Sequence, residues 1–175
     1  MFNLMVSYNP QTWDTSPYES DRSRFLECTE THLVEEFKHL TANNLEKLKS
    51  LPTLFVIEDE VCETRIGYIN ELRVRDSHIL VDFYFDPVFP SIAKGTILNL
   101  EKSLSFKRFE RSRTHWAIKD VDLFETLLRH GIITQEQIKN SNILREAKRR
   151  RSPNLTTLDS VNNDHVFIVH DMMII

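Results

Sequence analysis

The chain has 175 residues, of which 41% are hydrophobic and 27% are charged, a balance typical of one globular domain rather than a disordered segment. A net charge of −4 and only three glycines argue against a strongly basic nucleic-acid binder and against glycine-rich phosphate loops. The sequence shows neither a signal-peptide pattern nor an apolar stretch of about 20 residues, so we expect a cytoplasmic protein that does not enter a membrane. Cys28 and Cys62 are too few for a zinc site or a disulfide scaffold.

The first fifty residues are expected to form an arm and a pair of helices. Residues 1–20 mix turn-forming residues with scattered aromatic side chains, which predicts an irregular arm packed on the domain. Within residues 21–51, Leu33 and Phe37 fall on one face of a helix. Pro52 ends the helical region, because the residue before a proline avoids helical dihedrals. We therefore expect an αα-hairpin.

Residues 54–85 form the centre of the predicted fold. Residues 54–57 are a continuous apolar run, typical of a strand buried on both faces. Apolar and polar residues then alternate through residues 65–75 and again through residues 79–85, with a two-residue turn between them. This pattern predicts an α+β fold. Its three-stranded antiparallel β-meander, alone or as part of a small barrel, would be flanked by N-terminal and C-terminal helices.

Helices are expected again after the sheet. One is predicted after Thr96, and another begins near Asp122 and ends at Gly131. The segment Thr134-Gln-Glu-Gln137 fits a capping box and starts a helix that should run to about Lys148. We thus expect a domain in residues 1–150, a polar linker in residues 151–164, and a separate strand in residues 165–175.

The densest group of candidate binding residues lies in residues 111–119. Cationic donors beside an indole suit a nucleotide or another anion, through stacking and charge-assisted hydrogen bonds. The alternative interpretation places the indole in the core with the bases around its rim. The candidate ligand-binding residues are Arg111, Arg113, His115, Trp116 and Lys119.

A second basic group comprises Lys148, Arg149, Arg150 and Arg151. Together with the bases of residues 107–119, these side chains would contact phosphates in a nucleic-acid-binding module. Cations are also favoured at a helix C-terminus by the macrodipole, and the net negative charge of the chain disfavours nucleic acid as a partner.

Other patterns of chemically active residues carry little information. His32 and His39 are two helical turns apart, which is poor geometry for joint metal ligation. The acidic residues 58–60 are expected to form a solvated turn. We therefore predict no metal, no cofactor and no catalytic residue, and a stand-alone enzyme is the third-ranked interpretation.

The run Val166-Phe-Ile-Val-His170 resembles the first strand of the TIR-like nucleotide-binding domains of bacterial defence effectors. Such domains open with a similar run after a polar linker, although Asp171 replaces the expected glycine here. The segments 51–55 and 113–124 also resemble N-terminal domains that precede such effectors.

This resemblance implies an accessory or sensing domain of an anti-phage effector, truncated just after the first strand of its TIR-like domain. A full-length relative would hydrolyse NAD, but the catalytic glutamate and the nucleotide pocket of that domain are not in this sequence. The domain in hand would then be non-catalytic, and would bind a protein partner or a small nucleotide-like ligand.

Overall fold

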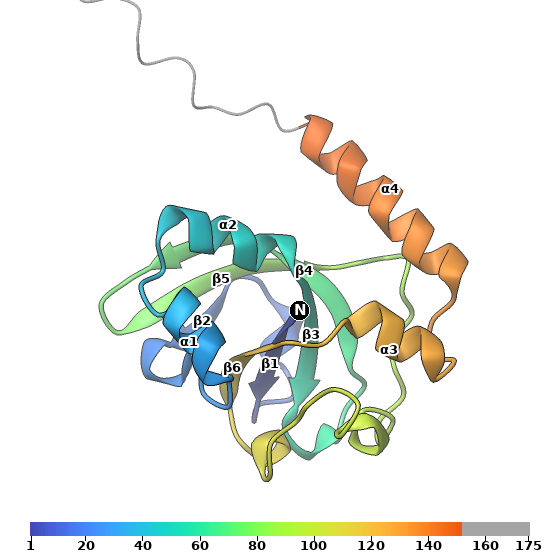
Figure 1. Cartoon of the computed structure of the whole chain (residues 1–175), viewed down its shortest axis with the longest axis horizontal. Coiled ribbons are helices and arrows are strands. Elements are labelled where there is room, and N and C mark those ends of the chain that lie inside the picture. Colours follow the sequence, from blue (N-terminus) through green and yellow to red (C-terminus); the bar gives the residue numbers. More distant parts are fainter. Residues whose placement is uncertain (152–175) are drawn as a thin grey trace, which may run out of the picture. The chain divides into compact units, whose positions relative to one another are not determined.

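A computed structural model describes residues 1–151 and shows a β-sheet with helices packed against both of its faces (Figure 1). The chain divides into two units, Met1–Asn142 and Ile143–Ile175, and the first contains the whole sheet. No helix in the described part is long and apolar enough to cross a membrane. The strands are β1 (Phe2–Ser7), β2 (Tyr18–Asp21), β3 (Pro52–Ile57), β4 (Arg65–Val74), β5 (His78–Phe85) and β6 (His115–Lys119), and the helices are α1 (Thr31–Phe37), α2 (Ala42–Ser50), α3 (Leu123–Arg129) and α4 (Gln135–Arg151).

The sheet has six strands in the order β2-β5-β4-β3-β1-β6, so the prediction of a three-stranded meander is wrong. The three predicted strands are present as β3, β4 and β5. However, β1 continues the sheet, parallel to β3 on one side and antiparallel to β6 on the other. The fold is α+β with a mixed sheet. The residues expected to form an irregular arm instead form β1 and most of β2. The sequence did not predict these two strands, because their pairing partners lie far along the chain and leave no local signal.

The sheet separates two apolar cores because its central strands are buried on both faces. In β3, Leu54 and Val56 pack on one face and Phe55 and Ile57 on the other, as expected of a doubly buried strand. We name the two cores by their helices. The α1–α2 core includes Leu33, Phe37, Leu48 and Trp116, and the α3 core includes Leu100, Leu104, Leu123 and Leu127.

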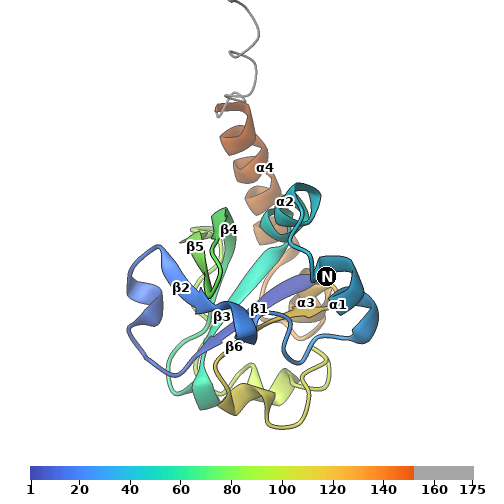
Figure 2. The same ribbon diagram turned by 90° about the vertical axis from the view of Figure 1, so that its left-hand side faces the viewer.

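The sheet is curled, and its edge strands β2 and β6 approach each other (Figure 2). The segment after β2 covers the outer edge of β6. Leu26 N donates to Trp116 O at 2.7 Å, and Ile118 N donates to Thr29 Oγ1 at 3.0 Å. Backbone groups that would otherwise be unpaired at this edge are thereby satisfied.

A β-bulge in β4 changes which side chains share a face. The pairing shifts between Ile69 and Glu71, so that Asn70 is the extra residue. Because side chains alternate along a regular strand, Ile66 and Leu72 would be expected on the same face of the sheet. Instead, Ile66 packs in the α3 core and Leu72 in the α1–α2 core. The predicted alternation holds after Asn70, whereas residues 66–69 before it are all buried.

The N-terminal helices are shorter than predicted. Residues 22–30 contain the 3-10 turn η2 (Arg22–Arg24) and a loop, and α1 begins only at Thr31. The expected helix after Thr96 is a single 3-10 turn, η4 (Leu98–Leu100).

The acidic turn of residues 58–60 is not wholly solvated, because Glu60 is buried. Its carboxylate accepts the backbone N–H groups of Ile97 and Leu98, each at 3.0 Å. It thus satisfies donors at the start of the η4 turn.

The C-terminal helix signals are confirmed. Asp122 caps α3 by accepting Glu125 N at 2.9 Å, and Gly131 follows that helix with a φ of +70°. Thr134 and Gln137 form the capping box of α4, with reciprocal bonds of 2.8 and 3.2 Å. The predicted linker and terminal strand, residues 152–175, lie outside the described residues.

Candidate functional site

Trp116, the centre of the predicted ligand site, is fully buried on β6. Its indole packs edge-on against Phe25 with ring centroids 4.7 Å apart, and Nε1 donates to Asn3 Oδ1 at 3.2 Å. The ring therefore presents no open face on which a ligand could stack. In this structure it fills the α1–α2 core.

His115 and Lys119 point to the opposite face of β6, because side chains alternate along a strand. Both meet Glu110, which lies in the 3-10 turn η5 (Glu110–Ser112). Lys119 Nζ lies 2.7 Å from Glu110 Oε2, and His115 Nε2 lies 3.0 Å from Glu110 Oε1. We call these three side chains, all at most 3% exposed, the Glu110 network.

The hydrogen-bond partners fix the charges in the Glu110 network. Lys119 Nζ also faces the carbonyl oxygens of Cys28 and Ser105, at 3.1 and 3.2 Å, so all three of its N–H groups donate and the nitrogen is an ammonium. Burial opposes this charge and lowers the pKa of Lys119, although the attraction of Glu110 counteracts the shift. Burial likewise opposes ionisation of Glu110, but His115 and Lys119 outweigh it and hold the pKa of that carboxyl below its ordinary value.

Two members of the Glu110 network, Glu110 and His115, form with Cys28 a group within the described residues that could hold a metal. Ligand atoms of Cys28, Glu110 and His115 lie within 4.8 Å of one another. Lys119, however, already supplies a cation to the Glu110 carboxylate. Burial, followed by the charge of Glu110, raises the pKa of the Cys28 thiol, which disfavours the thiolate that zinc requires. The group is therefore better explained as a structural ion network.

The two remaining predicted residues, Arg111 and Arg113, are exposed and bind different carboxylates. Arg111 Nη1 lies 3.3 Å from Glu101 Oε1. Arg113 donates through Nε and Nη2 to the two oxygens of Glu27, at 2.8 and 3.1 Å. The structure thus brings together only His115 and Lys119 of the five predicted residues, and places the others in the α1–α2 core and at the surface.

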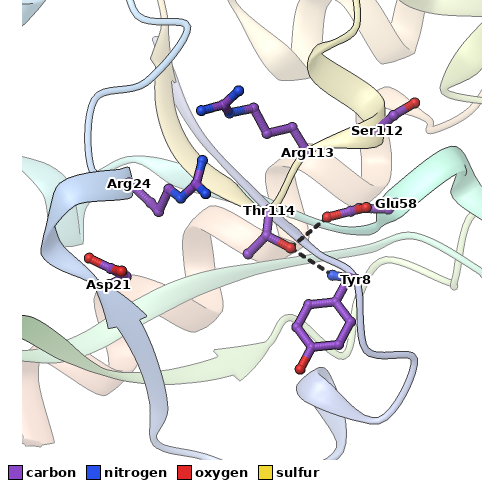
Figure 3. A pocket seen from close by; sticks show the side chains of 7 residues that line it. All are labelled: Tyr8, Asp21, Arg24, Glu58, Ser112, Arg113 and Thr114. Carbon is purple, nitrogen blue, oxygen red and sulfur yellow. Dashed lines mark hydrogen bonds between the residues drawn. The ribbon is translucent and has the colours of Figure 1, made fainter.

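A surface pocket of about 490 Å³ lies beside Arg113 (Figure 3). This volume is within the range of small-molecule sites. Thr114 lies at its centre, where its Oγ1 accepts Tyr8 N at 2.9 Å and donates to Glu58 Oε1 at 2.6 Å. The lining residues are Tyr8, Asp21, Arg24, Glu58, Ser112, Arg113 and Thr114.

The topology places this pocket at the carboxyl ends of the two parallel strands. Tyr8 directly follows β1 and Glu58 directly follows β3. Residues 112–114 lead into β6, and residues 21–24 end β2 and form η2. Crevices outside the carboxyl ends of parallel strands are preferred ligand sites in open α/β sheets. In this mixed sheet only β1 and β3 are paired in parallel, and the pocket shares with those sites its position at the carboxyl ends of a parallel pair.

Sequence reasoning found only Arg113 among the residues of this pocket. Ser112 and Thr114 lie in the same predicted stretch but were not chosen, and the remaining lining side chains come from segments that the sequence does not relate to that stretch. The parallel pairing of β1 with β3 would have indicated the place, but that pairing joins residues such as Leu4 and Leu54 and depends on recognising β1 as a strand.

Of the basic residues proposed to contact nucleic acid, some point into the protein and others are exposed. Within residues 107–119, Lys107 Nζ donates to Thr29 O at 3.0 Å, and Lys119 is buried. At the end of α4, Arg149 and Arg150 are exposed, and Arg150 Nη2 lies 4.0 Å from Glu146. The first stretch therefore directs part of its positive charge into the protein.

Comparisons with models of known protein families, with curated proteins and with solved structures each found no match for this chain.

Proposed function

We propose that residues 1–142 are a non-catalytic ligand-binding module whose surface pocket takes a small nucleotide-like molecule. The observation that carries this proposal is the position of the pocket at the carboxyl ends of the parallel strands β1 and β3. At this position the sheet holds the surrounding loops in a fixed arrangement.

The chemistry of the lining suits the parts of a nucleotide. The ring of Tyr8 is 73% exposed and offers a surface on which a base can stack. Glu58 accepts one hydrogen bond from Thr114 and has further acceptor capacity for the amino group of a base. Arg24 and Arg113 supply guanidinium groups for the anionic end of the ligand.

Thermal unfolding in the presence of AMP, GMP, CMP and UMP tests this proposal. At least one nucleotide should raise the melting temperature of the wild type, because a ligand that binds only the folded state stabilises it. Tyr8→Ala should lose most of that increase without changing the melting temperature of the free protein, since the ring is mainly exposed.

Arg129→Ala is the control, because Arg129 pairs with the exposed Glu125 and is not among the pocket residues. This variant should respond to the nucleotide as the wild type does. The proposal fails if no nucleotide stabilises the wild type, or if Tyr8→Ala responds as strongly as Arg129→Ala.

We further propose that the module serves an anti-phage effector with a TIR-like domain, acting as its accessory or sensing part. The support is the resemblance of Val166-Phe-Ile-Val-His170 to the first strand of such domains. We expect the genomic DNA that follows the codon for Ile175 to encode the remainder of a TIR-like domain in one of its three forward frames. Sequencing the locus decides this, and three frames without such a domain would remove the effector role while leaving the ligand-binding proposal intact.

A further inference from the structure

Two arginines from distant segments bind the same carboxylate at the edge of the pocket. Arg24 lies in η2 and Arg113 lies just before β6. Arg113 makes a two-pronged contact with Glu27, and Arg24 Nη1 lies 3.2 and 3.3 Å from its two oxygens. Figure 3 shows both arginine side chains on the same side of the pocket. We call Arg24 and Arg113 the arginine pair.

The arginine pair remains open to solvent although it is bound. The side chains of Arg24 and Arg113 are 39% and 55% exposed, and that of Glu27 is 23% exposed. Both arginines line the pocket, but Glu27 does not. A ligand in the pocket can therefore reach the guanidinium groups.

The backbone around Glu27 is held in an unfavourable conformation. Leu26 and Cys28, the residues on either side, have φ values of +69° and +58°, and neither is a glycine. A left-handed conformation is unfavourable for an L-residue other than glycine, because its Cβ comes too close to the backbone. Such strained positions concentrate at ligand clamps and switches, where the surrounding structure maintains them.

We propose that the arginine pair is an oxyanion subsite for the phosphate or carboxylate group of the pocket's ligand, and that Glu27 occupies this subsite until the ligand displaces it. The planar guanidinium fork matches a phosphate as well as it matches a carboxylate. The inference rests on the proposed function, because it assigns the anionic end of the same ligand to particular residues.

The other charges of the pocket restrict the ligand further. Asp21 accepts hydrogen bonds from the N–H and the hydroxyl of Ser23, and Glu58 accepts one from Thr114. These two carboxylates disfavour an anion anywhere except at the arginine pair. A ligand with one phosphate or carboxylate at one end and hydrogen-bond donors at the other fits this distribution, whereas a triphosphate does not.

Titration with inorganic phosphate and with acetate tests the subsite independently of any base. Glu27→Gln removes the internal competitor while preserving the side-chain size, so the variant should bind one of these two ions about tenfold more tightly than the wild type. Tighter binding of phosphate but not acetate assigns the subsite to phosphate esters, and the reverse assigns it to carboxylates. Isothermal titration calorimetry gives the dissociation constants.

Three matched variants make this test decisive. Glu125→Gln removes the same charge from an exposed ion pair outside the pocket, and should leave ion binding at the wild-type level. Glu27→Gln combined with Arg113→Ala should lose the gained affinity. Glu27→Asp keeps the charge on a shorter side chain, should give an intermediate affinity, and serves where Glu27→Gln is poorly folded.

The outcomes separate this inference from the proposed function. If Glu27→Gln binds phosphate and acetate no better than Glu125→Gln does, the arginine pair is a structural ion pair and the inference is wrong. If Glu27→Gln gains affinity for either ion but no nucleotide stabilises any variant, the oxyanion subsite stands and the nucleotide-like ligand does not.

Discussion

At the scale of single residues, the buried Glu110 network explains why the loop before β6 has a defined position. Glu110 receives donors from His115, Lys119 and the backbone N–H of Lys107, so both ends of residues 107–119 converge on one carboxylate. Removing one partner from a buried ion pair leaves an uncompensated charge, which costs far more than losing an exposed pair. The Glu110 network therefore stabilises the loop, and the loss of one of its charged side chains leaves another buried without its partner.

Glu110→Gln should lower the free energy of unfolding at neutral pH by about 3–5 kcal/mol, because Lys119 would keep a buried charge without its partner. Urea denaturation measures this change. Glu125→Gln is again a suitable control, since its ion pair with Arg129 is exposed and contributes about 0–1 kcal/mol. Equal losses in the two variants would contradict the assignment of Glu110 to a buried ionic network.

The same substitution should also alter the response to acid. The pKa of Glu110 in the folded state lies below its ordinary value of 4.5, so the stability that it contributes is present above that value and is lost as the pH falls through the folded pKa. The wild type should therefore lose stability more steeply than Glu110→Gln below about pH 4.5. Denaturation curves at successive pH values measure the two slopes.

At the scale of elements, β4 shows how two residues set the geometry of the sheet. Asn70 forms the bulge and donates to Asp82 Oδ2 on β5 at 2.8 Å. Gly67 lies where the backbone of β5 leaves no room for a side chain, since a Cβ at this position would be 2.1 Å from the backbone oxygen of Tyr84. At Gly67 the backbone of β4 packs directly against β5, and at Asn70 the pairing of the two strands shifts by one residue.

Gly67→Ala should destabilise the domain by about 1–3 kcal/mol, because the obstructing atoms belong to the backbone of β5 and cannot rotate away. Glu71→Ala in the same strand is the control, since Glu71 is exposed and its change should stay within about 0.5 kcal/mol. Chemical denaturation of both proteins compares them. If the two losses are similar, the close approach of β5 to Gly67 is not present in solution.

At the scale of the whole sheet, the position of β1 creates the candidate site. β1 lies between β3 and β6, and its parallel pairing with β3 brings the carboxyl ends of two strands to the same edge. The curl of the sheet then brings η2 and the start of β6 towards that edge, which completes the pocket. The strained segment around Glu27 belongs to this arrangement, because the same segment covers the edge of β6.

Local signals in the sequence determined the strands β3 to β5, the end of α2 before Pro52 and the capping of α3 and α4. In each of these, the pattern depends on residues within a few positions of one another. The signals are a continuous apolar run for β3, alternation for β4 and β5, and a proline or a capping residue at the helix ends. The α+β class follows from the same signals. The sequence also identified residues 111–119 as unusual, although it grouped side chains that β6 directs to opposite faces.

Only the tertiary structure decided the central place of β1, the change of face at Asn70 and the convergence of Arg24, Arg113 and Glu27. The strand β1 contains the buried polar residues Asn3 and Ser7, and it shows neither alternation nor an apolar run as long as that of β3. A bulge looks like any other residue, and ion pairs such as Arg113–Glu27 join positions 86 residues apart. These features arise from contacts between segments that meet only after folding, and the candidate site consists almost entirely of such contacts.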